Sequence, residues 1–73
     1  MLGQSLVLIH IILKILYEER SVTSSKLLKN LVLEKAARQK ITISEKSINL
    51  IINQMNNTKK IEFTQKEGWK IKI

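Results

Sequence analysis

The chain has 73 residues, a formal net charge of +7 and an isoelectric point near 10.0, and it contains no Cys, no Pro and no Asp. This composition excludes thiol catalysis, disulfides, Cys-rich zinc sites and a Ser-His-Asp triad, and so short a chain has little room for a deep catalytic cleft. We expect one small binding domain (residues 1–73), not an enzyme, without cofactor or metal, whose charge favours nucleic acid or an anionic membrane surface as partner.

The most apolar run, Leu6–Leu16, predicts a first helix over residues 4–19. A helix over this run is about 16 Å long, roughly half the thickness of a bilayer core, and Lys14 interrupts it. A signal peptide has basic residues before its apolar run, and no basic residue precedes this run. We therefore expect a cytoplasmic protein with no membrane span. His10, Lys14 and Glu18 form a narrow polar stripe, and no second metal ligand lies at a suitable spacing from His10.

Apolar side chains cover a wide arc of this helix. One stripe suffices for a helix on the outside of a three-helix domain, and it consists of Leu8, Ile9, Ile12, Leu13 and Leu16. A second ridge lies beside that stripe and consists of Val7, Ile11 and Ile15. We expect this ridge to be the interface of a homodimer. The alternative is that the C-terminal part of the chain covers it within one molecule.

Ser21–Ser25 separates this helix from a second one, predicted over residues 24–40. We expect Thr23 to be its N-cap, with Val22 and Leu27 forming a hydrophobic staple. Hydroxyl side chains at a helix start are caps far more often than nucleophiles. The apolar stripe of the second helix consists of Leu27, Leu28, Leu31, Val32 and Ala36.

The stripe of the second helix fades after Val32, so its last two turns are expected to project beyond the core. These turns carry Lys35, Arg38 and Gln39. Two interpretations stay open for their charges. They are either the solvated end of a helix, stabilised by the negative end of its dipole, or a clamp for DNA phosphates.

A third helix is predicted over residues 44–56, with either Thr42 or Ser44 as its N-cap. Its apolar face consists of Ile48, Ile51, Ile52 and Met55. The helix is expected to stop near Asn56–Asn57, where an Asn takes the left-handed conformation that Gly usually provides.

After residue 60 the period of the apolar residues changes from 3.6 to 2, which predicts antiparallel strands at about residues 61–64 and 69–73. Gln65–Gly68 is the turn between them, and Gly68 can adopt the positive φ that a short hairpin loop needs. The apolar face of this hairpin consists of Ile61, Phe63, Trp69, Ile71 and Ile73.

The positive charge is concentrated in two segments. Residues 23–40 hold five basic residues and one Glu, net +4, and residues 58–73 hold five Lys and two Glu, net +3, whereas the other segments are neutral. The basic segments flank a third helix rich in Asn, Gln and Ser. This distribution suits a DNA-binding protein, in which cations hold phosphates while amides and hydroxyls contact base edges.

The order of three helices and a terminal hairpin resembles the winged helix-turn-helix family of small prokaryotic or archaeal transcriptional regulators. Val22–Leu27 resembles the start of the second helix of the family, and Ile43–Met55 resembles its recognition helix. The resemblance implies a mainly α fold with a C-terminal β-hairpin, the wing. Two features depart from the family pattern: the second helix is one to two turns longer, and no Gly follows the third helix.

The resemblance further implies sequence-specific binding of double-stranded DNA, with the third helix in the major groove and the wing on the backbone or in the minor groove. The residues expected to contact bases are Lys46, Ser47, Asn49, Leu50, Asn53 and Gln54. Those expected at the backbone are Lys26, Lys35, Arg38, Lys59, Lys60, Gln65, Lys66 and Lys70. Winged helices also serve as protein-interaction modules, and RNA binding is a further alternative. Leu50 can meet either a thymine methyl group or a partner protein.

Overall fold

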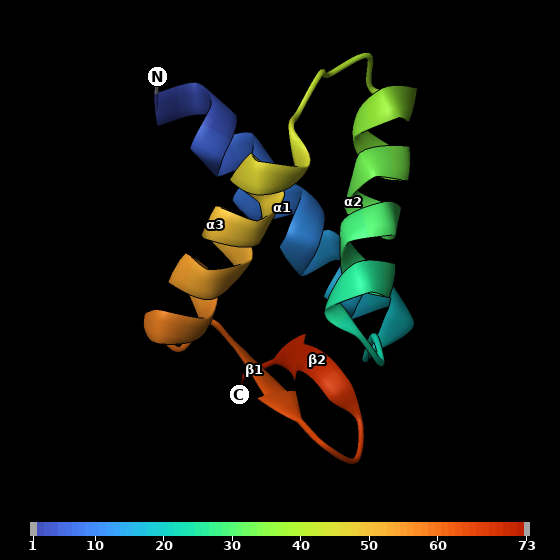
Figure 1. Ribbon diagram of the computed structural model, residues 1–73, viewed down its shortest axis with the longest axis vertical. Helices are drawn as coiled ribbons and strands as arrows, with labels where there is room; N and C mark the ends of the chain where they lie inside the picture. Colours follow the sequence, from blue (N-terminus) through green and yellow to red (C-terminus); the bar gives the residue numbers. More distant parts are fainter. Residues whose placement is uncertain (1, 73) are drawn as a thin grey trace.

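The computed structural model describes residues 2–72, which form three helices followed by a two-stranded antiparallel hairpin (Figure 1). The elements are α1 (Leu2–Glu19), α2 (Ser25–Arg38), α3 (Glu45–Asn57), β1 (Ile61–Thr64) and β2 (Gly68–Ile71). This winged-helix layout confirms the predicted fold class. The helices begin or end within two residues of the predicted limits, and Ile73, assigned to the second strand, lies outside the described residues.

The first helix is the centre of the fold, because α1 contacts α2, α3 and β2. In Figure 1 α1 lies between α2 and α3, and the hairpin lies across the lower end of the helices. Neighbours on several sides explain why α1 is apolar over so wide an arc. The core consists of Leu8, Ile11, Ile12, Ile15, Leu16, Val22, Leu28, Val32, Ala36, Ile43, Ile48, Ile51, Ile52, Met55, Ile61 and Trp69.

The ridge that the sequence assigned to a dimer interface is therefore mostly core. Ile11 and Ile15 are only 5% and 1% exposed, and Val7 is partly buried against the same core. The helical wheel indicated that other residues must cover this second apolar ridge. Residues of the same chain cover it, not a second molecule. Among residues 6–19 of α1, the large apolar side chains left exposed are instead Leu6 and Tyr17, at 58% and 79%.

Serine side chains cap both α2 and α3. The hydroxyl of Ser24 accepts a hydrogen bond from the backbone N–H of Leu27 at 3.1 Å, and Ser44 accepts one from Ser47 at 3.2 Å. Of the two N-caps predicted for α3, Thr42 and Ser44, the structure has Ser44.

The prediction that Thr23 caps α2 is wrong by one residue, and the staple based on it is wrong as well. Val22 is held in an antiparallel bridge with Trp69, so the chain turns into the helix one residue later than predicted. Val22 is 2% exposed, whereas Leu27 is 44% exposed.

A basic residue in the left-handed conformation follows each helix. Arg20, Lys40 and Lys59 have φ values of 69°, 59° and 63°. The prediction that Asn56 or Asn57 takes this conformation is wrong, because α3 continues through Asn57 and has Thr58 as its C-cap. Beyond Lys59 the N–H of Lys60 bonds to the carbonyl of Met55 at 2.9 Å, which closes a Schellman motif.

Replacing Lys40 with glycine is expected to raise the free energy of unfolding by up to about 1 kcal/mol. A left-handed residue with a Cβ costs roughly 1–2 kcal/mol, and the greater freedom of Gly in the unfolded chain offsets part of this gain. Urea unfolding followed by circular dichroism measures the change. Lys40→Ala is the matched control, because it removes the same charge but keeps the Cβ; equal stability of the two variants would contradict the strain at Lys40.

The hairpin is anchored to the linker between α1 and α2. Val22 and Trp69 exchange two backbone hydrogen bonds, of 2.9 and 2.7 Å, so Val22 acts as a one-residue third strand beside β2. The indole N–H of Trp69 also donates to the hydroxyl of Ser25 at 2.8 Å. Gly68 has the predicted positive φ, 86°, and a Cβ on it would lie 2.2 Å from the carbonyl oxygen of Val22.

One face of the hairpin is apolar, as predicted. Ile61 pairs with Ile71, and Phe63 pairs with Trp69. The Phe63 ring meets the Trp69 ring edge-on, with centroids 5.2 Å apart. Phe63 is nevertheless 48% exposed, whereas Trp69 opposite it is 6% exposed.

Candidate nucleic-acid interface

The outer face of α3 is polar apart from Leu50, and the exposed side chains of its middle turns have no polar partners within residues 2–72. α3 buries its apolar stripe against the core, which turns the residues between those positions outward. The exposed residues in the middle turns are Lys46, Asn49, Leu50, Asn53 and Gln54, and Glu45, Asn56 and Asn57 are exposed at the ends of the helix. In residues 2–72 none of the exposed side chains in the middle turns makes a hydrogen bond or an ion pair. Their amide and ammonium groups are therefore free to bind a ligand.

Ser47 differs from its neighbours on this face. Its side chain is partly buried, and its hydroxyl accepts a hydrogen bond from the Ser44 hydroxyl at 2.9 Å. Ser47 thus belongs to the cap of α3 and has less hydrogen-bonding capacity left for a base edge than the amides have. Leu50 is 60% exposed in the middle of the face, so its side chain contributes little burial of apolar surface to the stability of the fold.

Within residues 2–72, ion pairs compensate five of the six Glu side chains but only four of the 13 basic ones. The paired basic residues are Lys29, Lys35, Arg38 and Lys70. Nine basic side chains therefore have no carboxylate partner within the described chain, and these are Lys14, Arg20, Lys26, Lys40, Lys46, Lys59, Lys60, Lys66 and Lys72. The surface carries a large uncompensated positive charge, which favours an anionic partner.

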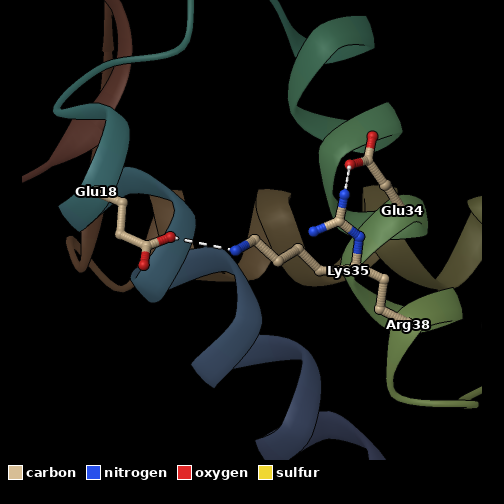
Figure 2. Close-up of polar contacts among 4 residues, drawn as sticks. All are labelled: Glu18, Glu34, Lys35 and Arg38. Carbon is tan, nitrogen blue, oxygen red and sulfur yellow. Dashed lines mark hydrogen bonds and ion pairs between the residues drawn. The ribbon is translucent and has the colours of Figure 1, made fainter.

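Lys35 and Arg38, near the end of α2, are both paired with carboxylates. Figure 2 shows Lys35 reaching from α2 to Glu18 on α1, at 3.2 Å, while Arg38 pairs with Glu34 at 2.9 Å. Ala36 is 1% exposed, so the last turns of α2 pack on the core, and the prediction that they project is wrong. The spacing of Glu34 and Arg38 already indicates their pairing, whereas the Lys35 pair depends on how α1 and α2 pack.

Lys70, assigned to the wing, faces two carboxylates. Its ammonium lies 3.1 Å from Glu67 and 4.0 Å from Glu62. The hydrogen bond to Glu67, and then the charge of that carboxylate, raise the pKa of Lys70. Lys70 therefore stays charged, but two acidic groups beside it reduce its attraction for a phosphate.

Glu45 is the one acidic residue in the first turn of α3. Its carboxylate lies 2.7 Å from the ammonium of Lys29, and that hydrogen bond, followed by the charge of Lys29, lowers the pKa of Glu45. The ionised carboxylate is also stabilised by the positive end of the helix dipole. Lys29 thus compensates the negative charge that Glu45 places at the start of α3.

Three free cations gather where α3 passes into the hairpin. Lys59 and Lys60 connect the two elements, and the N–H of Lys72 donates to the carbonyl of Lys60 at 3.2 Å. Lys72 therefore lies opposite Lys60, and all three side chains are exposed. Sequence reasoning missed Lys72, although strand alternation placed it on the same outward face as Lys70.

The remaining predicted contacts lie at the turn of the hairpin and at the start of α2. Gln65 and Lys66 are exposed in the turn. Lys26 is also exposed, and it follows Ser25, the residue bonded to the indole of Trp69. The start of α2 and the hairpin are thus held together, and each carries a free lysine.

No protein-family model matches the chain, and neither a curated protein nor a solved structure matches it. No helix in residues 2–72 is both long and apolar enough to cross a membrane. In the same part of the chain, no three His, Cys, Asp or Glu side chains lie close enough to hold a metal ion. The exposed groups in the middle turns on the outer face of α3 are amides, one lysine and one leucine.

Proposed function

We propose that this chain binds double-stranded DNA as a small transcriptional regulator of the winged helix-turn-helix class. The observation that carries the proposal is the unpaired outer face of α3. Asn49 and Asn53 offer amides of the kind that pair with adenine edges, Lys46 can donate to guanine, and Leu50 can contact a thymine methyl group. With α3 in the major groove, the hairpin would lie against the backbone or in the minor groove.

The free lysines support this proposal through the phosphate contacts they can make. Lys59, Lys60 and Lys72 lie beside the C-terminal end of α3, and Lys66 lies at the turn of the hairpin. Lys35, Arg38 and Lys70 were expected in the same role, but each has a carboxylate partner. We therefore assign the main backbone contacts to the free lysines and only minor ones to the paired cations.

A mobility-shift titration on duplex DNA at several salt concentrations tests the proposal. If about five phosphates are neutralised, log K should fall against log salt with a slope near −4 to −5. Single-stranded DNA and double-stranded RNA of the same sequence serve as controls and are expected to bind more weakly. Absence of a shift at micromolar protein, or a flat response to salt, would overturn the proposal.

Sequence preference should depend on the amides of α3. Asn49→Ala and Asn53→Ala are each expected to weaken binding to the preferred duplex by about 1–3 kcal/mol and to random duplex by little. Lys66→Ala should weaken both duplexes alike, because a phosphate contact carries no sequence information. Competition binding with the two duplexes measures the difference. Silent Asn variants, together with a changed preference in Lys66→Ala, would reverse the assignment.

Exposed apolar side chains favour a second candidate function, protein interaction through the same surface. Leu50 is 60% exposed on α3 and Phe63 is 48% exposed on the hairpin. A protein partner would need these side chains, whereas nonspecific DNA binding would not. Leu50→Asn separates the two: loss of affinity for a protein partner with unchanged affinity for random DNA favours the protein-interaction module.

We propose a homodimer through α1, on a different face from the one predicted. The exposed Leu6 and Tyr17 lie on one side of α1, with the partly buried Ile9 and Leu13 between them. Two-fold pairing there would suit a palindromic site with half-sites about 34 Å apart. Sedimentation equilibrium is expected to show a dimer that Leu6→Lys plus Tyr17→Lys dissociates while the helices remain folded. If the wild-type protein is a monomer at tens of micromolar, the proposed homodimer is wrong.

A further inference from the structure

A groove between the first half of α1 and the end of α2 lies apart from the main proposed DNA contacts and shares with the minor ones only Lys35 and Arg38. It has a volume of about 380 Å³, within the range of about 300–1,000 Å³ typical of small-molecule sites. Val7 and the 5% exposed Ile11 form the apolar part of its lining, and the polar side chains around them are His10, Lys14, Lys35, Arg38 and Gln39. Within the part of the chain that the structure describes, no acidic side chain lines the groove.

The charges of this groove are partly compensated. Glu18 pairs with Lys35, and Glu34 pairs with Arg38, as Figure 2 shows. Lys14 has no such partner within residues 2–72, so one positive charge is left over. The paired cations still have donors to spare, because an ammonium carries three N–H bonds and a guanidinium five, and each ion pair uses only part of them.

We propose that this groove binds an organic monoanion with a hydrocarbon body, such as a medium-chain carboxylate. The hydrocarbon would lie on Val7 and Ile11, and the carboxylate would accept hydrogen bonds from Lys14 and from the free donors of Lys35 and Arg38. One negative charge matches the one uncompensated cation. An inorganic anion would leave the apolar surface in water, and a neutral hydrocarbon would leave Lys14 without a partner.

Octanoate is a suitable probe, with octylammonium and acetate as controls. In a titration of the full chain followed by two-dimensional ¹H–¹⁵N NMR, octanoate should shift amides near residues 7–14 and 35–39 saturably. Octylammonium has the same body with the opposite charge, and acetate has the charge without the body, so neither should produce these shifts. Equal binding of octylammonium, or octanoate shifts located elsewhere, would overturn the proposal.

Variants of Lys14 test the charge directly. Lys14 is exposed and unpaired, so its replacement leaves the fold intact. Lys14→Ala is expected to weaken octanoate binding about two- to fivefold, as for an exposed ion pair, and Lys14→Glu about tenfold. Lys26→Ala, which removes an exposed lysine outside the groove, should not change octanoate affinity. Equal octanoate affinity in the wild type and Lys14→Glu would contradict the site, and so would duplex DNA that shifts the groove amides in place of octanoate.

Discussion

Gly68→Ala is expected to lower the free energy of unfolding by about 3 kcal/mol or more. The added Cβ would lie 2.2 Å from the carbonyl oxygen of Val22 and 2.6 Å from the Cα of Thr23, both of them backbone atoms that cannot rotate away. The positive φ adds roughly 1–2 kcal/mol for any residue with a Cβ, and overpacking adds about 1–3 kcal/mol.

Thermal unfolding followed by circular dichroism measures this effect. For a domain of this size each 1 kcal/mol shifts the melting temperature by about 4–8 °C, so a fall of at least about 12 °C is expected. Gly3→Ala is the matched control: the same change within α1 should be neutral or slightly stabilising, because Ala favours helix. If Gly68→Ala had the same melting temperature as the wild type, the hairpin would not be fixed against the linker as described.

Removing three free lysines together is expected to have the largest effect on DNA binding. In the triple variant Lys59→Ala, Lys60→Ala, Lys66→Ala, affinity for duplex DNA should fall about 10²- to 10³-fold at roughly 0.1 M salt. The slope of log K against log salt should become shallower by about three, one for each lost phosphate contact. Fluorescence anisotropy with a labelled duplex measures both quantities.

A second triple variant controls for total charge. Lys35→Ala, Arg38→Ala and Lys70→Ala remove the same number of positive charges, but from side chains that already have carboxylate partners. The expected loss of affinity is much smaller, about tenfold or less. If the two triple variants weakened binding equally, net charge and not the position of the free lysines would control the affinity.

The elements of the fold could be predicted because each one repeats a local pattern. The apolar spacing of three and four in α3 and the alternation in β1 and β2 depend only on which face meets the core. The positive φ of Gly68 followed from its lack of a Cβ. The left-handed residues after the helices could not be found in this way, because Lys40 and Lys59 carry no such preference; the Schellman hydrogen bonds impose the conformation.

The candidate site was predictable in part. The outward residues of α3 follow from its periodicity, which placed Asn49 and Asn53 correctly on the exposed face. The compensation of Lys35 and Lys70 by Glu18 and Glu67 depends on how the side chains meet in the folded chain. The burial of Ile11 likewise depends on how many neighbours surround α1, which a helical wheel does not contain.

The bridge between Val22 and Trp69 also locks the register of the hairpin. An isolated two-stranded hairpin is at best marginally stable in water, and a slip by one residue turns every side chain of a strand to the opposite face. Here β2 is held on both sides, by β1 and by Val22, so a slip would have to break both sets of hydrogen bonds and expose Trp69. The hairpin is thus held in place by the chain itself, so a ligand that bound there would cost little additional conformational entropy in that part of the chain.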